Sequence, residues 1–410
     1  MVSIARASFF YRAFKKALFI LVLASVQASV QASVQAKPSN ANDIEDPFDN
    51  TPLEEPSLLT SQNRLFYYQQ YNQASEGEDF STGQLALDLQ VQTSQGKNWQ
   101  ALTRVVATDN NHDDAQTHVL EAYGSWSSES RRYGLKAGRI KPQWSNGYNW
   151  NLANLLRPYQ DRPYLDIDNL EQLKGWDLIA ANFNYGSWQM AGYVVDLSRP
   201  GQSATTQQVL RMAYTGNIDG SWLVYQVPGS KPSWAANMSS LFGDHWLIRT
   251  EASVEQNREK SSTPLTENQS EYIKWVVGLA YQSINSGLAS VEYLYNQHGY
   301  NEAEWAFIEE LILDGSESTS QSQQAVGQLR KHYLYLQYVS EESWDLWQYR
   351  QSVQLNLDDD SQLHRLEVNK GFNDELSARL QIEYFTGCDT CEYGLAGLRM
   401  ASRLALYWSF

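Results

Sequence analysis

The last segment of the chain alternates apolar and polar side chains up to its final residue. Counting back from Phe410, one face carries Trp408 and Leu404, and the other carries Arg403 and Arg399. Neighbouring side chains of a β-strand point to opposite faces, so one face suits lipid and the other suits water. A soluble edge strand also alternates, but it rarely ends a chain on an aromatic residue without a polar tail.

The same alternation recurs along most of the chain and predicts 18 strands. The pattern is weakest over residues 219–227 and 232–242, so 16 strands are the alternative count. The 18 segments lie near 61–71, 82–93, 98–108, 115–126, 131–140, 175–185, 187–197, 206–216, 219–227, 232–242, 244–256, 271–284, 287–297, 329–340, 343–357, 361–371, 375–386 and 397–410.

The apolar runs of the chain are short. Beyond the first 36 residues, the seven-residue run Trp275–Tyr281 is among the longest, whereas a membrane-spanning helix needs about 20 apolar residues. A helical membrane protein is therefore excluded. The chain also holds 14 Trp and 25 Tyr, and alternation with many aromatics is typical of a transmembrane antiparallel β-barrel. A secreted β-sandwich or β-helix is the alternative, although no short fixed repeat supports a β-helix.

The first 36 residues have the features of a cleaved secretory signal. They contain four basic residues and no acid, followed by an apolar run of about ten residues and small residues at cleavage spacing. Residues 37–58 are rich in Pro, Asn, Asp and Glu and predict a flexible periplasmic leader, which leaves 59–410 for the barrel. Removing four bases changes the net charge from −16 to −20, so we expect no nucleic-acid partner.

The connections between the predicted strands alternate in length. Those after even-numbered strands are short, such as 217–220 and 372–374, and those after odd-numbered strands are mostly longer. Short periplasmic turns opposite long outer loops are expected of outer-membrane barrels. A barrel of 16 to 18 strands is wide enough to leave an aqueous channel.

The C-terminal segment resembles that of outer-membrane barrels. In that family, alternating apolar residues that end in a terminal Phe form the signal read by the barrel-assembly machinery, and here Trp408 and Phe410 match it. The resemblance implies an outer-membrane location in a Gram-negative bacterium, with lipid, lipopolysaccharide and that machinery as partners.

The third outer loop, roughly Lys141–Lys174, resembles the loop that narrows the lumen of general porins in its position and length. Gly138-Arg139 followed by Trp144, Gly147 and Trp150 is also similar to alginate-export-type channels. The resemblance implies a constriction, for which the loop offers charged residues, although they equally suit a solvated surface loop. These are Asp161, Arg162, Asp166 and Asp168.

The last three predicted strands place charged side chains on the water-facing side. Rings of charged side chains control which solutes pass a pore, and a face rich in arginine suits an anionic solute. The alternative is that arginine and glutamate merely pair to form a polar wall. By parity, the inward residues are Arg365, Glu367, Arg379, Glu383, Arg399 and Arg403.

The remaining motifs give structural rather than catalytic expectations. Cys388 and Cys391 predict a local disulfide, because the periplasm is oxidising. Trp305, Ile308 and Ile312 have helical spacing, which predicts a short amphipathic helix within 298–328. We expect no metal site, no cofactor and no enzyme, since no two histidines have the spacing of a zinc helix.

These patterns favour a porin-like channel for the passive passage of small hydrophilic solutes. The first alternative is a non-conducting barrel that acts as a scaffold, an adhesin or an export component, and the second is a barrel hydrolase. The sequence leaves the solute, the direction of transport and the oligomeric state open.

The signal and the C-terminal segment together predict where the mature chain is found. We expect cell fractionation to recover it in the outer membrane, with an N-terminus near Ser29, Ser33 or Lys37. Recovery as a soluble periplasmic protein would contradict the barrel prediction.

Overall fold

The computed structural model describes residues 58–74, 80–95, 98–110, 116–156, 174–197, 205–256, 271–284, 287–313, 329–341, 346–396 and 398–410. Within these ranges lie 18 strands, the helix α3 (Glu302–Leu313) and the short 3-10 helix η3 (Gly394–Ala396). The strands are β1 (Leu58–Ala74), β2 (Phe80–Gln95), β3 (Trp99–Asn110), β4 (Gln116–Ser127), β5 (Tyr133–Ile140), β6 (Trp176–Tyr185), β7 (Trp188–Asp196), β8 (Thr206–Tyr214), β9 (Ile218–Gln226), β10 (Ser233–Phe242), β11 (Trp246–Gln256), β12 (Glu271–Gln282), β13 (Leu288–Asn296), β14 (His332–Val339), β15 (Trp347–Asn356), β16 (Gln362–Gly371), β17 (Leu376–Thr386) and β18 (Leu398–Ser409).

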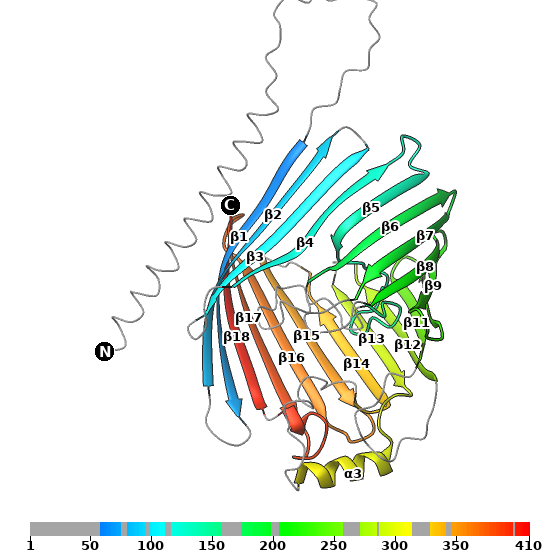
Figure 1. Cartoon of the computed structure of the whole chain (residues 1–410). Coiled ribbons are helices and arrows are strands. Elements are labelled where there is room, and N and C mark those ends of the chain that lie inside the picture. Colours follow the sequence, from blue (N-terminus) through cyan, green and yellow to red (C-terminus); the bar gives the residue numbers. More distant parts are fainter. Residues whose placement is uncertain are drawn as a thin grey trace, which may run out of the picture.

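The strands form one closed barrel. Each pairs with its neighbours in sequence, and β1 pairs antiparallel with β18, from Arg64 opposite Ser409 to Ala74 opposite Leu398. Figure 1 shows the blue β1 beside the red β18 in the barrel wall. The predicted closed antiparallel barrel of 18 strands is confirmed. No helix among the described residues is long and apolar enough to cross a membrane.

The two faces of the sheet have the chemistry that the alternation predicts. On β11 the side chains of Trp246 and Ile248 are 41% and 48% exposed on the outside, whereas Arg249 and Glu251 are 4% and 1% exposed on the inside. On β18 the exposed Leu404 and Trp408 alternate with inward residues in the same way. An apolar outer band around a polar interior is the pattern of a barrel that spans lipid.

The connections also follow the predicted alternation. Short turns join β6 to β7 and β10 to β11, and Gly186 and Gly243 in these turns have φ values of 56° and 63°. Glycine adopts such positive φ values without a steric penalty. The long connections 141–175 and 297–331 begin where β5 and β13 end, at the opposite end of the barrel from the short turns.

The weakest strand predictions are also confirmed. β9 and β10 pair from Tyr225 opposite Ser233 to Ile218 opposite Ser240, which rules out the count of 16. Helix α3 lies in the predicted range, and Asn301 and Glu304 cap its first turn with reciprocal hydrogen bonds of 2.8 and 2.9 Å. The signal peptide and most of the leader fall in 1–57, outside the described residues, and stay predictions.

Phe410 directly follows β18, the strand that closes the barrel with β1. The Phe410 amide donates to the Asn63 carbonyl at 3.1 Å. The residue is 45% exposed, and the centroid of its ring lies 5.6 Å from that of the Trp408 ring. An exposed aromatic pair at a barrel end suits the membrane interface.

Replacing Phe410 with Ser should therefore lower the yield of inserted, heat-modifiable barrel, because it removes the terminal apolar side chain of the predicted assembly signal. The matched control is Phe372→Ser, which removes an exposed ring from a turn at the same end of the barrel. Equal yields from both variants would count against an assembly role for Phe410.

Candidate functional site

The first part of the third outer loop turns into the barrel. Residues 141–156 follow β5, and Trp144, Trp150 and Ala153 within them are buried. Their contacts are made by inward side chains of strands that lie far away in the sequence. Residues 141–156, the described part of this loop, therefore occupy the barrel interior.

Glu251 on β11 is the central anchor of this loop. Its carboxylate accepts hydrogen bonds from Ser145 Oγ at 2.6 Å, from the Asn146 amide at 2.8 Å and from the Ala153 amide at 3.0 Å. Glu251 is only 1% exposed, and a buried carboxylate is stabilised when donors surround it. One side chain thus holds both ends of the segment 145–153.

A second anchor lies two strands away. Glu292 on β13 accepts from the amides of Tyr148 and Asn149, each at 2.8 Å, and forms a salt bridge with Arg249. Arg249 also donates to the Asn146 carbonyl at 2.7 Å, and its guanidinium carbon lies 3.1 Å from the centroid of the Tyr148 ring. These charge-assisted hydrogen bonds attach the loop backbone to β11 and β13.

Apolar packing holds the loop against one side of the interior. Trp144 contacts Tyr193 and Tyr225, with ring centroids 4.9 and 6.0 Å apart, and it belongs to a buried cluster with inward residues of β5–β10. Trp150 packs on Tyr333 and Tyr335 of β14. The loop therefore covers the inner face from β5 to β14.

The inner face from β15 through β18 to β1 is mostly polar instead, although Tyr68 and Ala405 at one end of it belong to a buried apolar cluster with Phe66. The strand register arranges its side chains in three rows, which we call the polar wall, and they alternate with exposed leucines such as Leu366 and Leu380 on the outside. The rows are Gln348, Asn369, Arg379, Ala405 and Tyr68; Arg350, Glu367, Gln381, Arg403 and Gln70; and Ser352, Arg365, Glu383, Ala401 and Asn72.

The charged groups of the polar wall are bonded to one another. Arg365 donates to Glu383 at 2.7 Å, and Arg379 Nε lies 3.7 Å from a Glu367 oxygen. Arg403 donates to Gln70 at 3.2 Å, and Gln381 donates to Glu383 at 2.9 Å. Five of the six predicted inward residues therefore lie together. Four of them form the arginine–glutamate pairs that the sequence offered as the alternative to a free arginine cluster, and Arg403 bonds to Gln70 instead.

The sixth residue, Arg399, lies apart from these pairs. It shares the inward parity of β18, but it is exposed near the outer end of the strand, one row beyond Ala401. Arg350 is not among the inward residues predicted from the sequence. In the structure Arg350 lies opposite Glu367 in the strand register, but it takes no part in the Arg365–Glu383 and Arg379–Glu367 salt bridges. The alternation within the predicted strand 343–357 already places position 350 on the inner face, so it could have been predicted.

Two further groups of predicted residues have different outcomes. Asp161, Arg162, Asp166 and Asp168 lie outside the described residues. Cys388 and Cys391 form the predicted disulfide. Across the described ranges, no group of three or more His, Cys, Asp or Glu side chains could hold a metal ion.

Comparison with known proteins places this geometry in a known fold. No protein-family model and no curated protein sequence matches the chain. Pseudomonas aeruginosa OccK11 (OpdR) is similar in structure, with a TM-score of 0.55 and 9% identity over 86% of this chain and 96% of that one. Acinetobacter baumannii OccAB1 gives a TM-score of 0.53 and 9% identity over 85% and 96% of the two chains. Both are outer-membrane porins. The chain has the barrel fold of an outer-membrane porin.

Removing the negative charge of Glu251 should loosen the inward loop. In Glu251→Gln, a carboxylate that accepts several hydrogen bonds is replaced by an amide, one end of which can only donate. Some buried polar groups are then left without a partner, and each such group lowers stability by about 1–3 kcal/mol. The amides of Asn146 and Ala153 should then exchange hydrogen with solvent about tenfold faster or more, as measured by hydrogen–deuterium exchange.

The matched control is Glu255→Gln on the same face of β11, where Glu255 pairs with Lys274 at 3.1 Å. Equal protection of the loop amides in wild type and Glu251→Gln would show that Glu251 is not its anchor.

Proposed function

We propose that this chain is an outer-membrane channel through which small hydrophilic solutes diffuse. The observation that carries the proposal is the two-sided interior. A loop bonded to Glu251 and Glu292 covers one side, and the polar wall forms the other. Eighteen strands enclose a lumen wide enough for water, and a solute would pass along the polar wall.

The outer-membrane setting belongs to the same proposal. The exposed outer side chains include rings near the strand ends, such as Trp99, Tyr185 and Phe242, which suit the two lipid–water interfaces. Lipid and lipopolysaccharide would contact this surface, and the barrel-assembly machinery would insert the chain. The porin fold of similar structures supports the channel over the non-conducting and enzymatic alternatives.

Planar-bilayer recording tests conduction directly. The purified, heat-modifiable barrel should give stepwise ionic currents, and liposomes that contain it should swell in small neutral sugars. A folded barrel that inserts without any current would contradict the channel and favour a scaffold, adhesin or export component.

The charge of the polar wall gives the channel a preference for anions. Its three rows hold four arginines and two glutamates, so the wall carries a net charge of +4 − 2 = +2. In a narrow lumen a solute cannot keep a Debye length of about 8 Å from the wall, so this charge is only partly screened.

Replacing Arg350 and Arg403 with Gln should shift the reversal potential in a salt gradient toward that of a cation-preferring channel. These two arginines are chosen because Arg365 and Arg379 pair with the two glutamates, so the double variant keeps both salt bridges. The control is Lys231→Gln, just before β10, where Lys231 forms an exposed pair with Glu271 at the start of β12.

An unchanged reversal potential in the double variant would place the selective section elsewhere in the channel. The channel proposal itself would stand in that case, because the current and the liposome swelling test it separately.

A further inference from the structure

The two cysteines of the chain lie in the last outer loop, between β17 and β18. The disulfide joins Cys388, which is exposed, to Cys391, which is buried. Because the bond spans a sequence separation of only three, it restricts a very short loop and contributes little to the stability of the whole barrel. Its effect is local, on the two enclosed residues Asp389 and Thr390.

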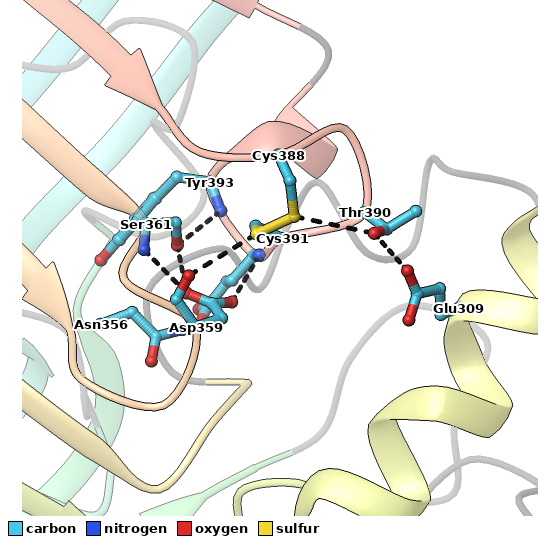
Figure 2. Close-up of a disulfide and its surroundings, with 9 residues drawn as sticks. Glu309, Asn356, Asp359, Ser361, Cys388, Thr390, Cys391 and Tyr393 are labelled. Atoms are coloured by element: carbon cyan, nitrogen blue, oxygen red, sulfur yellow. Dashed lines mark hydrogen bonds between the residues drawn. A yellow bond between two sulfur atoms is a disulfide. The ribbon is translucent and has the colours of Figure 1, made fainter.

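Thr390 connects this small ring to helix α3. Figure 2 shows its hydroxyl between the disulfide and the helix, and it donates a hydrogen bond to the Glu309 carboxylate. The same hydroxyl oxygen lies 3.7 Å from Cys388 Sγ. The disulfide therefore fixes the position of the residue that holds the C-terminal half of α3.

The chain just after the disulfide is held in a different way. Glu392 is fully buried, and its carboxylate accepts from the Tyr333 hydroxyl, from Asn356 Nδ2 at 2.8 Å and from the Leu329 amide at 3.1 Å. The Glu392 amide donates to Asp359 at 2.9 Å. None of these bonds involves residues 388–390, so we expect them to persist when the disulfide opens.

The N-terminal half of α3 has its own attachment. Trp305 is buried, and the guanidinium carbon of Arg330 lies 4.9 Å from the centroid of its ring. The Arg330 amide in turn donates to the Tyr333 hydroxyl at 2.6 Å. Helix α3 thus has buried side chains that do not contact residues 388–390 in any of these bonds, Trp305 and Ile308, and a polar attachment through Thr390 at Glu309.

We propose that Cys388–Cys391 is a thiol-exchange site that controls the attachment of the C-terminal half of α3. The thiolate of a small external thiol attacks the exposed Cys388 Sγ and forms a mixed disulfide, while Cys391 leaves as a thiolate and takes up a proton. A second thiol then attacks the mixed disulfide. This step releases Cys388 as a thiol and leaves the two small molecules joined by a disulfide.

The consequence of this exchange is confined to one part of the outer loops. With the ring open, residues 388–390 are no longer constrained, and Thr390 releases Glu309. Helix α3 lies at the end of the barrel that carries the long connections (Figure 1), so its release changes the outer mouth and leaves the wall intact. The proposal does not depend on conduction through the barrel.

Hydrogen–deuterium exchange of the full-length barrel, with and without dithiothreitol, tests the proposal. Reduction should raise the exchange of the amides of Ile308–Glu310 severalfold and leave those of Glu392 and Tyr393 unchanged. Cys388→Ser/Cys391→Ser should match the reduced protein and show no response to dithiothreitol. Thr390→Val, which keeps the disulfide, should loosen the same half of the helix.

Thiol titration checks that the disulfide is reduced, and heat-modifiable mobility checks that the barrel is folded. If the double variant does not fold, the comparison of oxidised and reduced wild type still tests the proposal. Equal exchange of α3 in the oxidised and fully reduced barrel would overturn the proposal. Undiminished protection of α3 in Thr390→Val would overturn it as well, because the helix would then be held by another contact.

Discussion

Pairing between the first and the last strand is the interaction on which the rest of the structure depends. Lipid offers no partner for backbone N–H and C=O groups, so a sheet in a membrane cannot leave an edge open. Here β1 pairs with β18 from Arg64 opposite Ser409 to Ala74 opposite Leu398, and this pairing closes the edge. Closure also encloses the inner face of every strand, which creates an interior that polar side chains and a loop can share.

Buried carboxylates organise that interior in two different ways. Glu251 is stabilised by donors of the loop, namely the Ser145 hydroxyl and the amides of Asn146 and Ala153, so it positions the loop. Glu367 and Glu383 face arginines on neighbouring strands and stay in the wall. Desolvating a carboxylate is costly unless it is paired or hydrogen-bonded, so each acid requires a specific set of donors. The resulting interior has a fixed loop on one side and a charged wall on the other.

The sequence predicts the barrel well because alternation depends only on neighbouring residues. Parity places Arg365, Arg379 and Arg403 on the inner face, but it does not say which acid each arginine meets, since that depends on the register between strands. The anchoring of the loop is harder to predict, because Ser145 and Glu251 are 106 residues apart. Residue-type patterns carry no signal for such a distant contact.

Strand ends show a similar limit. β1 begins at Leu58, inside the predicted leader, because its pairing with β2 continues past the point where β18 ends. Arg399 has the predicted parity, but it lies beyond the rows in which the wall residues bond, near the register shift between Gln73 and Ala74. The alternation of side chains along one strand predicts neither how far neighbouring strands are shifted relative to each other nor where a bulge occurs.

Labelling of single added cysteines with a charged, membrane-impermeant thiol reagent tests the two-sided interior most directly. Arg350→Cys lies on the polar wall, Ala180→Cys lies beneath the inward loop in the buried cluster, and Val353→Cys lies on the outer face of β15. We expect rapid labelling at position 350, with a fall in current, and protection at positions 180 and 353. Equal labelling at positions 350 and 180 would contradict it.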